Sequence, residues 1–167
     1  MLHLVLCWHF HQPDYRTEQG DYRLPWTYLH ALKDYSDMAA HLEAVPNVRA
    51  VVNFVPSLVE QLDDYASQFV SGQPRDPLLA WLIDPDLGQL PETRKAELIE
   101  ACLRLNHATM LEPFPAYRLL YRHYETLKGA EAGLAYLSGQ YLADLVTWYH
   151  LAWTGETNTA ALSIYRR

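Results

Sequence analysis

Polar side chains that could bind a small molecule lie at or near the ends of two predicted β-strands, residues 2–8 and 49–55. These side chains are His9, His11, Gln12 and Asp14 after the first segment and Asn53 within the second. In parallel α/β folds, functional groups gather at the C-terminal ends of the strands. Imidazole, amide and carboxylate groups at such a place can hydrogen-bond to the hydroxyl groups of a substrate. The spacing therefore predicts a ligand site at the ends of the two strands.

His9 and His11 also allow a different chemistry. Alternate residues of an extended segment point the same way, so two imidazoles can ligate one divalent metal. A metal-dependent hydrolase needs further ligands from later strands, and the sequence offers no identifiable ones. Such a hydrolase using His9 and His11 remains one alternative. The motifs of serine hydrolases, P-loop NTPases and dinucleotide-binding proteins do not occur in the sequence.

The elements that would position these groups follow from the periodicity of apolar residues. Such residues recur at steps of three and four over residues 26–45, which predicts a helix. The β-branched segment 49–55 predicts a strand, and Pro56 then leads into a helix for which Ser57 would start a capping box. The almost continuously apolar run 2–8 fits a strand buried on both faces. Strand, helix, strand, helix is the order of a parallel sheet with covered faces.

After Gly72 the pattern changes, and residues 75–155 hold helical stretches and no convincing strand. The expected fold class is α/β. We divide the chain into a βαβα part at residues 1–72, a largely helical insertion of the same domain at residues 73–155, and an irregular tail at residues 156–167.

Composition narrows the class of protein. The formal net charge of −7 argues against a nucleic-acid-binding protein, which needs a basic surface. No apolar stretch approaches the roughly 18–20 residues of a membrane span, and the N-terminus lacks the pattern of a signal peptide. We interpret Cys7 and Cys102 as buried small hydrophobic residues in a reducing compartment. These features predict a soluble, cytoplasmic protein.

Four segments, taken together, resemble glycoside hydrolase family 57, the α-amylase and 4-α-glucanotransferase type. In chain order they are His11-Gln12-Pro13 after the first strand, residues 20–26 continuing as 29–35, Asn53 to Leu58 with Glu60-Gln61-Leu62, and Asp144-Leu145 with Trp148 to Trp153. Each motif is short, but four matches in the right order make the resemblance specific.

The resemblance implies a (β/α)7-type barrel, of which this chain holds the first two strands, acting with retention on α-glucans or maltooligosaccharides without a metal or cofactor. It places the nucleophilic Glu and the general acid Asp on later strands. We therefore expect both catalytic carboxylates outside this chain, and this chain alone to be inactive. By position His11 would line the subsite of the sugar to be cleaved, with His9 and Trp26 nearby. Together with Gln12 and Asn53, these are the candidate substrate-binding residues.

The acidic residues nearest the first strand end do not suggest a catalytic pair. Glycoside hydrolysis needs two carboxyl groups about 5–5.5 Å apart for retention or about 6.5–9.5 Å apart for inversion. Asp14, Glu18 and Asp21 all lie in a loop, where ordinary solvated acids are the more common interpretation. We assign no catalytic residue to this chain.

A second class of function stays open, a non-catalytic remnant that binds carbohydrate or a protein partner. It rests on the 5 Trp and 12 Tyr, whose flat rings can stack on sugars, and on the missing carboxylates. A sheet of two strands would also expose apolar edge and helix faces, which predicts self-association.

Overall fold

The computed structural model describes residues 3–130 and 133–161. The chain divides into two compact units, Met1–Asp76 with Thr154–Arg167 and Pro77–Trp153. Within the described residues, no helix combines the length and the apolar character that crossing a membrane requires.

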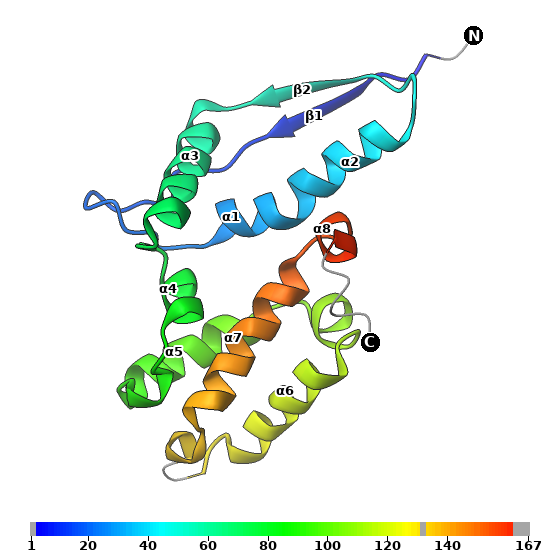
Figure 1. The fold of residues 1–167 in the computed structure, drawn as a ribbon. Coiled ribbons are helices and arrows are strands. Elements are labelled where there is room, and N and C mark those ends of the chain that lie inside the picture. Colours follow the sequence, from blue (N-terminus) through cyan, green and yellow to red (C-terminus); the bar gives the residue numbers. More distant parts are fainter. Residues whose placement is uncertain (1–2, 131–132, 162–167) are drawn as a thin grey trace. The chain divides into compact units, whose positions relative to one another are not determined.

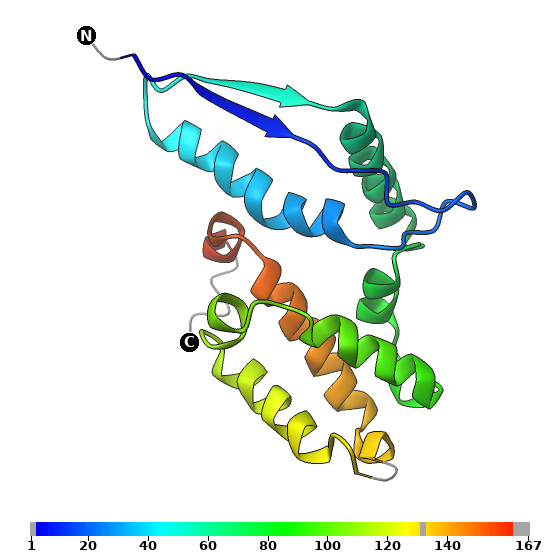
Figure 2. The same ribbon diagram turned by 180° about the vertical axis from the view of Figure 1, so that it is seen from behind.

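The first unit contains a parallel two-stranded sheet. Strand β1 (Leu6–Phe10) pairs with β2 (Ala50–Phe54), and His9 lies opposite Asn53 in the register. A continuous helical run lies along one face of this sheet (Figures 1 and 2), and helix α3 (Pro56–Ser71) follows β2. The run consists of α1 (Trp26–His30), a π-helical turn η1 (Ala31–Tyr35) and α2 (Ser36–Ala44). The predicted order of strand, helix, strand and helix is confirmed.

The two faces of the sheet differ in exposure. Phe10 is buried on the helical side, whereas Cys7 and His9 are exposed. The expectations of a strand buried on both faces and of a buried Cys7 are therefore wrong. Apolar composition marks a residue that can be buried, but burial also requires a layer over that face.

Helix α3 begins differently from the predicted capping box. Val55 is its N-cap and provides no side-chain hydrogen bond, while Pro56 occupies the first turn. The hydroxyl of Ser57 instead donates to the backbone oxygen of Gln12, 3.0 Å away. The residue taken from the sequence as a helix cap thus fastens the loop that follows β1.

The second unit is helical. Its elements are α4 (Pro77–Ile83), η2 (Leu87–Gln89), α5 (Glu92–Leu103), η3 (His107–Leu111), α6 (Pro115–Leu127), η4 (Gly133–Tyr136) and α7 (Gly139–Trp153). Helix α7 packs against α4, α5 and α6 and buries Leu142 and Leu145 completely. Cys102, on α5, is buried as predicted. Residues 75–130 and 133–155 contain no strand, which confirms the helical interpretation of this region.

The chain returns to the first unit through helix α8 (Glu156–Ala161). Asp37 on α2 accepts hydrogen bonds from the backbone N–H groups of Glu156 and Thr157, at 3.1 and 3.0 Å. The bond from Thr157 is the main reason why the pKa of Asp37 is lowered. The tail expected to be irregular at residues 156–167 therefore begins with a helix, and residues 162–167 lie outside the described part.

Candidate functional site

Three of the candidate residues come together at the ends of the strands. His9 is beside Asn53 in the register, and both side chains are exposed. The ring of His11, also exposed, stacks on that of His9 with a centroid separation of 5.7 Å and an interplanar angle of 20°. The arrangement presents two imidazoles and an amide to solvent on the sheet face opposite Phe10. Such groups can donate to and accept from a polyhydroxylated ligand.

Gln12 occupies a different environment from its neighbour His11. It is buried, and its side-chain amide lies between two tyrosines. The Tyr15 hydroxyl donates to Gln12 Oε1 at 2.8 Å, and Gln12 Nε2 donates to the Tyr35 hydroxyl oxygen at 3.0 Å. Gln12 therefore fixes the loop after β1 to the helical run, and within the described residues its amide nitrogen uses one of its two N–H groups in this way.

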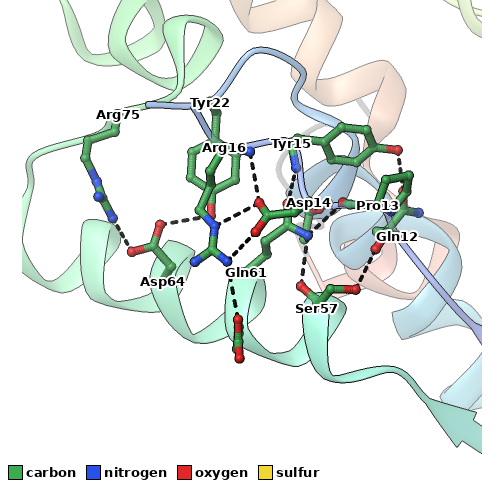
Figure 3. A network of polar contacts seen from close by, with 12 residues as sticks. Gln12, Pro13, Asp14, Tyr15, Arg16, Tyr22, Ser57, Gln61, Asp64 and Arg75 are labelled. Carbon is green, nitrogen blue, oxygen red and sulfur yellow. Dashed lines mark hydrogen bonds and ion pairs between the residues drawn. The ribbon is translucent and has the colours of Figure 1, made fainter. Parts of the chain in front are cut away.

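A second glutamine, Gln61 on α3, secures the same loop from below (Figure 3). Its side chain is completely buried, with Nε2 donating to the backbone oxygens of Pro13 and Ser57 at 2.9 Å each. Its Oε1 accepts from the Tyr15 backbone N–H at 3.1 Å and from the Thr27 hydroxyl at 3.2 Å. One amide thereby joins the loop, α1 and α3, and every donor and acceptor it carries is used.

Ion pairs continue the network along α3 (Figure 3). Arg16 binds Asp14 through Nε at 2.9 Å and Nη2 at 2.7 Å, and it also reaches Glu60 at 3.4 Å. The hydrogen bond from Arg16 is the main cause of the lowered pKa of Asp14. A general acid in glycoside hydrolysis needs a raised pKa. Asp14 is therefore suited to a structural ion pair and not to proton donation.

Further along the helix, Asp64 accepts a hydrogen bond from the Tyr22 hydroxyl at 2.8 Å and pairs with Arg75. Burial is the largest cause of the raised pKa of Tyr22, and the bond to Asp64 adds to it. These contacts hold the loop from Pro13 to Tyr22 against α3. The loop that carries the candidate site is thus fixed over much of its length.

Trp26 begins the helical run and is half-buried. Its ring lies 6.5 Å from that of His30, which pairs with Asp34 and lies 6.2 Å from the ring of Tyr35. Tyr35 in turn contacts Gln12. Trp26 is therefore linked to the strand end through two rings of its own helical run.

Sequence reasoning missed Tyr15, Tyr35 and Gln61. One signal could have found the glutamine. The buried positions of α3 are Leu58, Gln61, Tyr65 and Gln68, which form a helical stripe. A polar residue in an apolar stripe indicates a buried hydrogen-bonding role, because an unpaired buried amide is costly. The two tyrosines carry no comparable signal, since their ring packing and their hydroxyl partners depend on tertiary contacts.

The described residues contain no group of three or more His, Cys, Asp or Glu side chains placed to hold a metal ion. His9 and His11 together would supply two ligands.

Comparison with known proteins identifies the family to which these elements correspond. The model of the family described as glycosyl hydrolase family 57 matches residues 5–162, nearly the whole chain. No curated protein and no solved structure gives a significant match. The family match spans both strands, the loop with His11 and Gln12, and the helical second unit.

Proposed function

The chain belongs to glycosyl hydrolase family 57, and from that premise we propose that it forms the first part of an enzyme that hydrolyses or transfers α-glucans. The family implies glycoside hydrolase or glucanotransferase chemistry. The observation that carries the proposal is the exposed group of His9, His11 and Asn53 at adjacent ends of two parallel strands. Ligands of α/β folds bind at such ends.

The proposed architecture is a (β/α)7-type barrel whose first two strands are β1 and β2. Two features support it. The strands are parallel neighbours joined by a helical crossover, and the face with Cys7 and His9 is open while the helical run covers the other face. In a barrel of alternating strands and helices, the helices lie outside and the opposite face lines the interior. His9 and Asn53 would then face the inside of the barrel.

Within this site we propose that His9, His11, Gln12, Trp26 and Asn53 bind the sugar. The imidazoles and the Asn53 amide would hydrogen-bond to hydroxyl groups, and the half-buried Trp26 would offer a flat apolar face. Gln12 would contribute its remaining amide N–H. Such bonds raise the rate where they strengthen as the sugar ring flattens toward the oxocarbenium-like transition state.

The retaining mechanism needs a nucleophile and a general acid about 5–5.5 Å apart. We propose that both carboxylates belong to strands outside this chain, because both carboxylate oxygens of the acid nearest the strand end, Asp14, are bonded to Arg16. This chain would then bind maltooligosaccharides without cleaving them. Release of shorter sugars by the purified chain would contradict this assignment.

Replacing His11 with alanine tests the proposed site. Isothermal titration calorimetry with maltoheptaose is expected to show binding by the unmodified chain and affinity at least about tenfold weaker for His11→Ala, since a lost hydrogen-bonding group costs on the order of 1.4 kcal/mol. His41→Ala is the matched control, because His41 is an exposed histidine of α2. It should leave the affinity unchanged. Absence of heat with the unmodified chain, or equal affinity for both variants, would reject sugar binding at the strand end.

We also propose that copies of the chain associate through exposed apolar surface. Val51 and Phe54 on β2 are 56% and 53% exposed, and β2 has one neighbouring strand within the described residues. Exposed apolar strands favour association. Light scattering at increasing concentration should therefore give a mass above that of one chain. A constant monomer mass would contradict the proposal.

A further inference from the structure

One helical residue, Tyr35, contacts both neighbours of His11 in the sequence. The edge of its ring packs on Phe10, with ring centroids 4.8 Å apart and an interplanar angle of 64°. Its hydroxyl oxygen accepts the hydrogen bond from Gln12. From this double contact we infer that Tyr35 is a positioning residue that fixes the direction of the His11 imidazole. The inference rests on the proposed function of His11 in sugar binding.

Tyr35 makes these contacts on the side of the sheet opposite the exposed histidines. Phe10 and Gln12 are buried, while His9 and His11 are exposed. Because successive side chains of an extended segment point to opposite faces, fixing Phe10 and Gln12 fixes the backbone from which His11 projects outward. Tyr35 therefore sets the geometry of His11 without contacting the ligand.

The Gln12 amide accepts one of its two tyrosine hydrogen bonds and donates the other. Tyr15 donates to the amide oxygen, and the amide nitrogen donates to Tyr35. Both ends of the amide are therefore restrained by a different segment of the chain, the loop on one side and the helical run on the other. Removing either hydroxyl leaves a buried amide atom without that partner, which is costly enough to reorient the side chain.

Tyr35 reaches this place because the helical run changes its winding there. It is the last residue of the π-helical turn Ala31–Tyr35. Such turns are rare and are often found at functional sites. The Ser36 hydroxyl donates to the Ala31 backbone oxygen at 2.8 Å. The Leu32 oxygen accepts from the backbone N–H of Gly155 at 3.0 Å and from Asn158 Nδ2 at 2.8 Å.

The segment that begins α8 thus supports the turn that presents Tyr35. This segment packs closely against α2, because a Cβ atom added to Gly155 would lie 2.6 Å from Asp37 Oδ2. Asp37 also binds the first N–H groups of α8. The chain of contacts runs from Asn158 through the π-helical turn to Tyr35, and from Tyr35 to the neighbours of His11.

The test is Tyr35→Phe, which keeps the ring against Phe10 and removes the hydroxyl. Tyr65→Phe is the control, because Tyr65 lies on another part of the same unit and its hydroxyl likewise makes a side-chain hydrogen bond, donating to Asp76 at 2.9 Å. The first measurement is the NMR spectrum of the His11 ring without sugar, assigned by the signal that disappears in His11→Asn. The second is the affinity for maltoheptaose.

Tyr35→Phe should shift the His11 ring signals and weaken the affinity by about threefold to tenfold, the range for one net hydrogen bond. Tyr65→Phe should lower the melting temperature and change neither measurement. Asn158→Ala should move the same His11 signals in the same direction by a smaller amount. Unchanged His11 signals in a folded Tyr35→Phe protein, or equal shifts in Tyr65→Phe, would overturn the inference. A failure of the unmodified chain to bind sugar would instead reject the proposed function, since the sugar-free spectrum tests positioning independently.

Discussion

Replacing Gln61 with leucine is expected to lower the free energy of unfolding by about 3 kcal/mol or more. Leucine fills most of the volume of the side chain but removes all four of its hydrogen bonds. The Tyr15 N–H, the Pro13 oxygen and the buried Thr27 hydroxyl would lose their partner on α3. An unsatisfied buried group costs about 1–3 kcal/mol. Urea denaturation followed by circular dichroism measures the difference.

The matched control for Gln61→Leu is Gln68→Leu, in the same helix. Gln68 is 4% exposed, and its side-chain amide makes two hydrogen bonds within the described residues, donating to Asp64 and accepting from the Arg75 N–H. Its replacement should cost about 1–2 kcal/mol, because fewer buried groups are left unpaired. A loss for Gln61→Leu no larger than that for Gln68→Leu would mean that the buried amide does not hold the loop.

Replacing Leu58 with alanine is expected to lower the free energy of unfolding by about 2–5 kcal/mol, the range for a leucine truncated in a close-packed core. Leu58 has no exposed surface and lies in the first turns of α3, which packs against α1. The resulting cavity would loosen the two helices that supply Gln61 and Thr27 to the network.

Val59→Ala is the comparison for Leu58→Ala, because Val59 is the next residue of the helix and is 42% exposed. Val59→Ala should lower the free energy of unfolding by less than about 1 kcal/mol, as for substitutions at exposed positions. Similar melting temperatures for the two variants would indicate that the packing of α1 on α3 contributes little to stability.

The parts of this fold that were predictable from the sequence are those in which local pattern and tertiary environment agree. The segment that forms the strand at residues 50–54 contains β-branched residues, and the apolar residues that recur at steps of three and four over residues 26–45 form the helical run against the sheet. The family resemblance, which the family match confirms, came from motifs that include His11 and Asn53. The polar residues that follow the two predicted strands led to the prediction of a site at the strand ends.

The parts that were not predictable depend on contacts between distant residues. The π-helical turn that places Tyr35 against Phe10 and Gln12 has its Leu32 oxygen bound by Gly155 and Asn158, far away in the sequence. The helix periodicity in that region fits an ordinary α-helix equally well. The exposure of Cys7 could not be read from its apolar neighbours, because it depends on which layers cover the sheet.

The residues that hold the loop around His11 also lie in motifs for which the sequence suggests simpler roles. Ser57 looked like a helix cap, and the sequence predicted for Gln12 a ligand-binding role without a structural one. In the structure both hold the loop, Ser57 through the backbone oxygen of Gln12 and Gln12 through two tyrosines. A polar residue beside a site can serve the site by fixing the chain, and sequence alone does not separate the two roles.

The most direct test of the account is an NMR titration of the chain with maltoheptaose, following the ring signals of the histidines and the side-chain amide of Asn53. We predict saturable shifts at His9, His11 and Asn53, with the signals of His41 and His107 unmoved. Shifts confined to histidines of the helical second unit, or no shifts at millimolar sugar, would contradict the claim that the strand ends form the sugar-binding site.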